Sequence, residues 1–341
     1  MDLPYLTDGL PGTGGVLRAR PEDFVVDEEP AYPPSGSGDH VFVLVEKREL
    51  TSPQAAQAIA RALGIAERDI GIAGMKDRHA ITRQWMSLPP PVTPEAARAL
   101  AIEHVAIVEV ARHPHKLRSG HVRGNRFALR VRDPGPDAAV RARAILDRLA
   151  EAPGAPNWYG EQRFGRDGDN AARGRALVTG AQARGRDKRM DRLMVSALQS
   201  ELFNTWLVAR IADGLYATAI SGDLLHKVGG GMFDCTAPEI DAPRVRGGEV
   251  IPTGPMFGAE MRGPADGTDA AAREAVILDG AGLTRDTFTR VRAIAEGTRR
   301  DAAIAVRDVA VELDADGLVV RFALPGGAYA TAVMREVMKP S

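Results

Sequence analysis

The chain has 341 residues, of which 44% are hydrophobic and 26% are charged, which is enough for two domains with cores of their own. Its formal net charge of −1 argues against a general affinity for nucleic acid, so any such binding has to come from a local basic surface. The single cysteine, Cys235, excludes an internal disulfide and a cysteine-based zinc or iron–sulfur centre. The seven histidines include no His-x-x-x-His pair, which argues against a metal enzyme.

The N-terminal residues 1–15 are acidic and rich in proline and glycine, without the basic start and apolar centre of a signal peptide. No apolar run in the chain is long enough to cross a bilayer, so we expect a cytoplasmic protein with no membrane partner. Residues 15–29 are expected to be extended, because Pro21 restricts its neighbours and Phe24 begins a strand-like run. Taken alone, Phe24 is most simply a core residue.

Strands and helices then alternate up to residue 151, which predicts an α+β fold. Residues 40–46 alternate as a strand, with valines 41, 43 and 45 on one face. Ser52 and Pro53 form an N-cap and first-turn signal for a helix that Gly64 ends. A short helix starting at Thr93, strands over 105–111 and 125–132, and a helix over 134–151 follow.

The stretch over residues 70–85 concentrates ionisable side chains behind a short apolar run. Residues 70–73 predict a buried strand that ends at Gly74, where the backbone can turn sharply. Lys76, Asp77, Arg78 and His79 follow. Flanking cations favour the ionised carboxylate, so Asp77 is a candidate nucleophile or base. The alternative is a solvated turn with a surface ion pair, which is commoner for an arbitrary triplet of this kind.

The clearest charge anomaly covers residues 112–132, which contain many cations and no acid. Against a near-neutral chain, such a run predicts a surface that binds RNA phosphates, although a merely solvated face is the alternative. The candidate RNA-binding residues are Arg112, Lys116, Arg118 and Arg123. Within the strand over 125–132, the odd-numbered Phe127, Leu129 and Val131 face one side and the arginines face the other.

The second half of the chain begins with a linker at residues 153–156. Aromatic and charged residues mix over 157–165, which suits either RNA contact or an interdomain hinge. Glycines 229–231 lack the lysine and helix start of a nucleotide loop, so a β-turn is expected there. The other predicted elements are a helix over 188–212, helices near 268–278 and 286–296, and a hairpin of strands 303–313 and 318–322.

The stretch around Asp77 resembles the signature of the TruD family of tRNA pseudouridine synthases, G-x-K-D-[RK]-x-A-x-T-x-Q. The matching positions are Gly74, Lys76, Asp77, Arg78, Ala80, Thr82 and Gln84. Further stretches resemble the family's other motifs in the same order along the chain. They lie at residues 18–28, 124–127, 157–165, 202–204, 253–258 and 322–336. At position 18, where the family usually has lysine, this chain has Arg18, which keeps the charge but differs in shape, and Arg20 is the alternative for this cation.

This resemblance implies a pseudouridine-synthase catalytic domain with a mixed, mostly antiparallel sheet and an inserted α/β domain. The catalytic domain would comprise residues 1–156 and 301–341, and the inserted TRUD domain residues 157–300. The implied reaction isomerises a uridine of tRNA, at position 13 of the D-arm in this family, without a cofactor or metal. tRNA is then the partner, and we expect a monomer.

The resemblance also assigns roles to individual residues. Asp77 takes the place of the catalytic nucleophile, and attack at C1′, attack at C6 and removal of a ribose proton all remain open. The residues placed around the flipped uridine are Phe24, Asn125, Phe127, Phe322 and Arg18. Two other classes of protein compete: a non-catalytic RNA-binding chaperone, which needs no Asp77, and a hydrolase that uses Asp77 with His79.

Overall fold

The computed structural model describes residues 3–185 and 187–339, and these fold into two compact units that are each discontinuous in sequence. We call Leu10–Asp147, Val306–Ala330 and Val337–Ser341 the large-sheet unit. Met1–Gly9, Arg148–Ala305 and Thr331–Glu336 form the helix-rich unit. Among the described residues, no helix is both long and apolar enough to cross a membrane.

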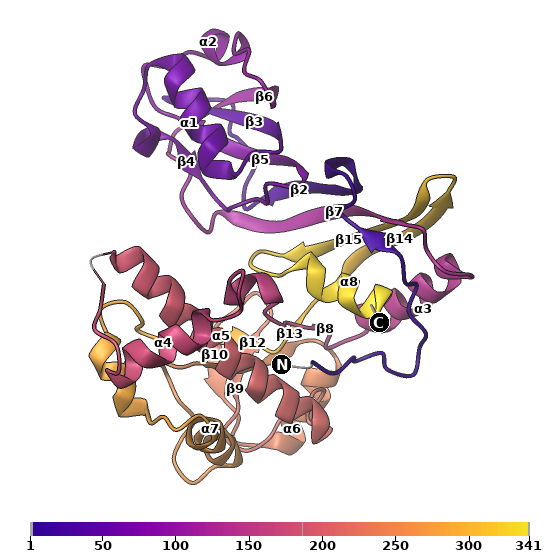
Figure 1. The fold of residues 1–341 in the computed structure, drawn as a ribbon, viewed down its shortest axis with the longest axis vertical. Coiled ribbons are helices and arrows are strands. Elements are labelled where there is room, and N and C mark those ends of the chain that lie inside the picture. The colour runs from indigo at the N-terminus through magenta and orange to yellow at the C-terminus, as the bar shows by residue number, and fades with distance from the viewer. Residues whose placement is uncertain (1–2, 186, 340–341) are drawn as a thin grey trace. The chain divides into compact units, whose positions relative to one another are not determined.

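One nine-stranded sheet dominates the large-sheet unit, with strand order β14-β15-β7-β2-β5-β3-β6 and the short strands β1 and β4 added beside β7 and β5 (Figure 1). Only the β2–β5 pair is parallel, so the predicted α+β fold with a mostly antiparallel sheet is confirmed. The strands are β1 (Val16–Leu17), β2 (Phe24–Pro30), β3 (His40–Arg48), β4 (Gly71–Ile72), β5 (Ile81–Leu88), β6 (Val105–His113), β7 (Val122–Arg132), β14 (Arg307–Asp314) and β15 (Gly317–Pro325).

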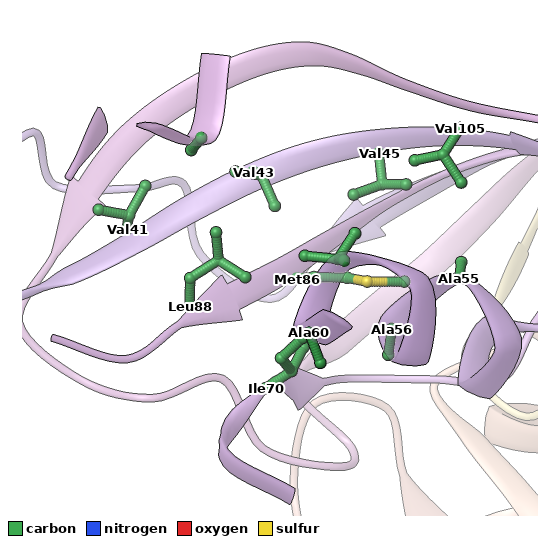
Figure 2. Close-up of a cluster of buried hydrophobic side chains, with 12 residues drawn as sticks. Val41, Val43, Val45, Ala55, Ala56, Ala60, Ile70, Met86, Leu88 and Val105 are labelled. Carbon is green, nitrogen blue, oxygen red and sulfur yellow. The ribbon is translucent and has the colours of Figure 1, made fainter. Parts of the chain in front are cut away.

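The core beside the Asp77 stretch forms where helix α1 (Ser52–Leu63) covers one face of β3 and β5. The predicted valine row of β3 points into it, and all three valines are fully buried. Figure 2 shows these valines and Met86 facing the small alanines of α1, which let the helix approach the sheet closely. Helix α2 (Pro94–Arg98) contributes Ala97 to the same core.

The predicted N-cap of α1 is corrected by one residue. Thr51, not Ser52, caps the helix: its side-chain oxygen accepts a hydrogen bond from the Gln54 amide, and Gln54 reaches back to the Thr51 backbone. Ser52 is buried instead and is hydrogen-bonded away from the helix end. The left-handed Gly64 (φ 66°) ends the helix as predicted.

Helix α3 (Ala138–Ala150) starts four residues later than the predicted 134 because Asp137 is left-handed, with φ 57°, and cannot belong to a right-handed helix. In β7 the predicted alternation is confirmed, since Phe127, Leu129 and Val131 are buried and the arginines lie on the other face.

The helix-rich unit contains the long helix α5 (Lys188–Ala212), whose predicted bounds are confirmed. Its other helices are α4 (Asn170–Thr179), α6 (Pro238–Arg246) and α7 (Asp269–Gly280). A sheet of order β10-β9-β11-β12 comprises β9 (Leu224–Lys227), β10 (Met232–Asp234), β11 (Val250–Met256) and β12 (Thr298–Asp301). The glycine triplet lies in the β9–β10 turn, as predicted. Helix α8 (Ala330–Met338) closes the described chain.

Of two predicted elements near residues 286–322, the helix is wrong, whereas the hairpin is confirmed except that its first strand begins later than expected. Residues 286–296 do not form an α-helix, and Arg285–Val291 form a 3-10 helix instead, whose buried Phe288 and Val291 lie three residues apart, on the same side of such a helix. The strand expected from residue 303 is interrupted. β13 (Ala303–Ile304) pairs with β8 (Ala155–Pro156), and β14 begins only at Arg307, where the chain changes partner to β15.

The first three residues of the aromatic stretch at 157–165 are buried, whereas Glu161 and Gln162 are exposed. Trp158 is 1% exposed and Tyr159 is 8% exposed, and the side chain of Asn157 donates a hydrogen bond to the Asp301 carbonyl. These two rings therefore form part of the packing of the helix-rich unit.

The core under α1 gives a first prediction. Ile59→Ala should lower the opening free energy of β3 amides by about 2–5 kcal/mol, because Ile59 is fully buried against the sheet and the shortened side chain leaves a cavity. Hydrogen exchange of the β3 amides measures the stability of the large-sheet unit separately from that of the helix-rich unit. Gln57→Ala, on the exposed face of the same helix, is the control and should change it by less than about 0.5 kcal/mol.

Candidate active site

Asp77 lies in the loop over residues 73–80, between β4 and β5. Its side chains alternate in exposure: Met75 is 72% exposed, Lys76 is buried, and the side chain of Asp77 is 47% exposed. The loop therefore directs Lys76 into the unit and presents the Asp77 carboxylate to solvent.

Arg18 links Asp77 to Phe24. Its Nη2 donates a hydrogen bond of 2.6 Å to Asp77 Oδ2, and its guanidinium carbon lies 3.9 Å from the centre of the Phe24 ring. The Arg18 backbone is left-handed, with φ 62°, which is uncommon for a residue with a side chain and turns it toward the loop. In the described part of the chain, the other carboxylate oxygen, Asp77 Oδ1, has no hydrogen-bond partner.

A buried ion pair lies directly beneath the loop. Lys76 Nζ donates to Glu28 Oε2, and the two side chains are only 6% and 0% exposed. Burial raises the pKa of Glu28, and the Lys76 charge opposes this rise. The Trp85 amide also donates to Glu28. Removing either partner would leave a buried charge uncompensated, so the pair holds Lys76, and with it the loop, against β2.

A second cation, Lys47, supports the loop from β3. Lys47 is fully buried, and its Nζ donates to the carbonyl oxygens of Leu50 at 2.6 Å and Asp77 at 2.8 Å. Burial lowers its pKa to about 8, although the Asp77 charge raises it. No role was predicted from the sequence for Lys47 or Glu28. A signal for Lys47 was present, because it continues the buried row of valines 41, 43 and 45 on β3.

Ser52 and Gln84 complete the support. The Lys76 amide donates to Ser52 Oγ at 2.9 Å, Ser52 Oγ donates to Gln84 Oε1, and Gln84 Nε2 donates to the Gly74 carbonyl at 3.1 Å. Side chains from β3, α1 and β5 thus hold backbone groups of the loop at residues 74, 76 and 77. These hydrogen bonds satisfy backbone groups that a buried turn would otherwise leave unpaired.

The three phenylalanines assigned to the uridine form a continuous row on one face of the sheet. Phe24 and Phe127 have ring centres 6.4 Å apart, and Phe127 and Phe322, which are paired across β7 and β15, are 5.5 Å apart. The rings are only 2%, 7% and 2% exposed for Phe24, Phe127 and Phe322. Through Arg18, Phe24 is connected to Asp77; the other two rings extend the row away from this contact.

Asn125 lies on the same face, opposite Glu28 on β2 and Leu324 on β15. Its side-chain oxygen Oδ1 is buried without a hydrogen-bond partner in the described residues. A buried acceptor without a hydrogen-bond donor is costly, so Asn125 Oδ1 is a candidate acceptor for a donor of a bound molecule.

The basic run separates into two groups. Three arginines of β7 form ion pairs: Arg126 with Glu29 and Asp308, Arg130 with Asp314, and Arg132 with the buried Asp23. The four candidate RNA-binding residues form no ion pair among the described residues. Arg112 and Lys116 donate only to backbone carbonyls, and Arg118 and Arg123 are exposed.

His79 is exposed, and no hydrogen bond joins it to Asp77 within the described part of the chain, where Arg18 and Lys47 are the side chains that bind Asp77. A hydrolase that activates Asp77 through His79 would require that contact. Likewise, the histidines, carboxylates and the cysteine of the described residues form no group of three that could hold a metal ion.

Comparison with known proteins identifies the family of this chain. The family model described as tRNA pseudouridine synthase D (TruD) matches residues 1–185 and 182–337. A tRNA pseudouridine synthase D from Anaeromyxobacter dehalogenans (strain 2CP-C) is 51% identical over 344 residues, which cover 99% of this chain and 97% of that protein. One from Thermus thermophilus is 40% identical, covering 98% of this chain and 92% of the relative.

A crystal structure of a candidate tRNA pseudouridine synthase D (TruD) from Methanosarcina mazei has the same fold, with a TM-score of 0.80, 21% identity and 99% of each chain covered. The long family match and the identity to full-length relatives agree with the ordered motifs around Asp77. This chain belongs to the TruD family of tRNA pseudouridine synthases.

Proposed function

We propose that this protein converts uridine to pseudouridine in tRNA, at uridine 13 of the D-arm, with Asp77 as the nucleophile. Relatives that match nearly the whole chain bear the name tRNA pseudouridine synthase D, which supports the reaction class. The observation that carries the assignment to Asp77 is its setting: an exposed carboxylate, on a loop held by buried side chains, with one oxygen bound to Arg18 and the other without a partner in the described residues.

The reaction is an isomerisation, so no atoms or electrons are gained overall. The bond between C1′ and N1 breaks, the uracil rotates, a bond forms between C1′ and C5, the proton on C5 leaves, and N1 gains a proton, so the atoms balance. The Asp77 carboxylate serves this sequence by attacking C1′ or C6, or by taking a ribose proton. Arg18 orients the carboxylate through Oδ2, which leaves Oδ1 toward the substrate.

The uridine has to leave its stack before it can react, at a cost of a few kcal/mol. Stacking of the base on an aromatic ring offsets about 1–3 kcal/mol of that cost. We assign this ring to Phe24, which Phe127 contacts edge-on, while Phe322 packs against Phe127 in turn. The Arg18 guanidinium covers Phe24 here, so the base has to share or displace that contact. The partnerless oxygen of Asn125 suits a uracil N–H donor.

The unpaired cations Arg112, Lys116, Arg118 and Arg123 are proposed to bind phosphates of the tRNA. Their lack of ion pairs in the described chain supports this role, because a phosphate then need not compete with a carboxylate. The three arginines of β7 that do pair with acids are not included.

We also propose that residues 157–300 form a domain inserted into a catalytic domain made of 1–156 and 301–341, of which residues 1–2, 186 and 340–341 lie outside the described chain. The discontinuity of the large-sheet unit, which stops at Asp147 and resumes at Val306, supports an insertion. We further propose a cytoplasmic monomer that works without a bound cofactor.

The assignment of Asp77 predicts that Asp77→Asn and Asp77→Ala lower turnover by at least about 10⁴-fold, the scale of losing an enzyme's nucleophile, while tRNA binding changes only a few-fold. Tritium release from C5-labelled uridine in tRNA measures turnover. Asp69→Asn, an exposed aspartate of the same unit, is the control and should keep wild-type turnover. Wild-type turnover in Asp77→Asn would instead favour a role for the protein that does not depend on this carboxylate, such as an RNA chaperone.

The proposed RNA surface predicts that replacing Arg112, Lys116, Arg118 and Arg123 together with glutamine weakens tRNA binding and reduces its salt dependence. Each lost phosphate contact should flatten the slope of log K against log salt by about 0.7–0.9. Filter binding at several salt concentrations measures this slope. The control replaces the ion-paired Arg98, Arg130, Arg143 and Arg321, which removes the same charge. Equal slopes for the two variants would contradict the assignment.

A further inference from the structure

We propose that Lys47 is a positioning residue of the reaction, whose buried ammonium group fixes the backbone of Asp77 and thereby the reach of its carboxylate. The inference rests on the proposed role of Asp77 as nucleophile. It adds a residue 30 positions away in sequence, on strand β3, to the loop that carries Asp77.

The geometry makes Lys47 the point where three segments meet. From the end of β3, its Nζ donates 2.8 Å to the carbonyl of Asp77 itself and 2.6 Å to the carbonyl of Leu50, in the turn before α1. The strand, the start of the helix and the active loop are thus joined through one nitrogen. A hydrogen bond to the backbone of the nucleophile's own residue restricts its main chain directly, whereas the Arg18 contact restricts only the side chain.

Stability alone does not account for a lysine here. The preceding inward positions of β3 are valines, and Lys47 is as completely buried as they are. A buried ammonium is costly unless it is paired, and within the described residues no carboxylate forms an ion pair with Nζ; its hydrogen-bond partners are two neutral carbonyls. An apolar side chain would suit the core better, so the lysine is retained for what its charge and donors do at the loop.

The charged groups that act on Lys47 come from the Asp77 loop. The negative charge of Asp77 favours the protonated form of Lys47, and the positive charge of Lys76 disfavours it. Lys76 is itself paired with Glu28 of β2. The residues opposite Lys47 on β5 and β6 are Thr82 and Val105, which carry no charge. Burial is the largest influence and lowers the pKa of Lys47 to about 8. Loss of its proton leaves a weaker donor to the Asp77 carbonyl.

Activity and stability should therefore respond to pH in opposite directions. Turnover should fall as pH rises through about 8, because Lys47 then loses its proton. Stability should not fall for this reason. In the unfolded chain the lysine has the ordinary pKa of 10.5, so between about 8 and 10.5 the unfolded state binds more protons than the folded state. The contribution of Lys47 to stability thus rises with pH over the range in which its support of the loop declines.

The experiment measures kcat, KM for tRNA and unfolding in the full-length protein for Lys47→Met, Lys47→Arg and Val45→Ala. Lys47→Met is close to the lysine in length and removes both hydrogen bonds of Nζ; we expect kcat to fall about 10- to 100-fold, the scale of misplacing a catalytic group, with KM within about threefold. Lys47→Arg keeps the charge at all pH values used and should retain kcat without the decline near pH 8. Val45→Ala, in the same buried row, should lower the unfolding midpoint and leave kcat unchanged.

The inference is overturned if Lys47→Met keeps wild-type kcat, or if Val45→Ala loses kcat as much as Lys47→Met does, since the lysine would then act through stability alone. An unchanged alkaline decline in folded Lys47→Arg would also overturn it. If Lys47→Arg does not fold, the wild type decides: a fall in kcat centred near pH 8 with no fall in the unfolding midpoint supports the inference, and its absence overturns it. Wild-type turnover in Asp77→Asn would instead contradict the proposed function itself.

Discussion

The proposed role of Asp77 requires a carboxylate that is accessible to an RNA base and yet held in one place, and the buried polar side chains beneath its loop reconcile these two demands. Loops at the surface of a protein are usually more mobile than the helices and strands that they connect. Here the side chain of Lys76 points inward to Glu28, while Ser52, Gln84 and Lys47 bind backbone groups of the loop. The cost is two buried ammonium groups, of which only one has a carboxylate partner within the described residues. Such a network restricts a loop more than apolar packing would, because each bond specifies a direction.

The same sheet explains why a nearly neutral protein can carry a basic surface. The arginines that β7 exposes on the face away from the phenylalanine row are paired with acids from β2, β14 and neighbouring turns, so they neutralise charge within the unit. The four candidate RNA-binding cations, Arg112, Lys116, Arg118 and Arg123, have no such partners in the described chain. A count of basic residues along the chain treats both groups alike, whereas their electrostatic availability to a phosphate differs.

Much of the local structure could be read from periodic patterns. The valines of β3, the bounds of α5, the alternation of β7 and the turn at the glycine triplet were all predictable, because each depends on side-chain spacing or backbone freedom within one segment. The predicted boundaries are wrong where contact with a distant segment determines the local structure. The strand expected from residue 303 is divided because its first residues pair with β8 and its later ones with β15. The cap of α1 moved to Thr51 because Ser52 is engaged by Gln84, 32 residues away.

By itself, the sequence determined the family and the identity of the candidate nucleophile, because a signature of fixed spacing around Asp77 is legible without coordinates. It also predicted an α+β fold with a mostly antiparallel sheet. Only the tertiary structure decided what holds Asp77, which oxygen of it is bound, which arginines are already paired, and that the phenylalanines form one row. The physical reason is that each of these depends on a partner from a distant segment. A lysine among valines signals that something polar must meet it, but the chain reveals that partner only when β3, α1 and the loop before β5 are brought together.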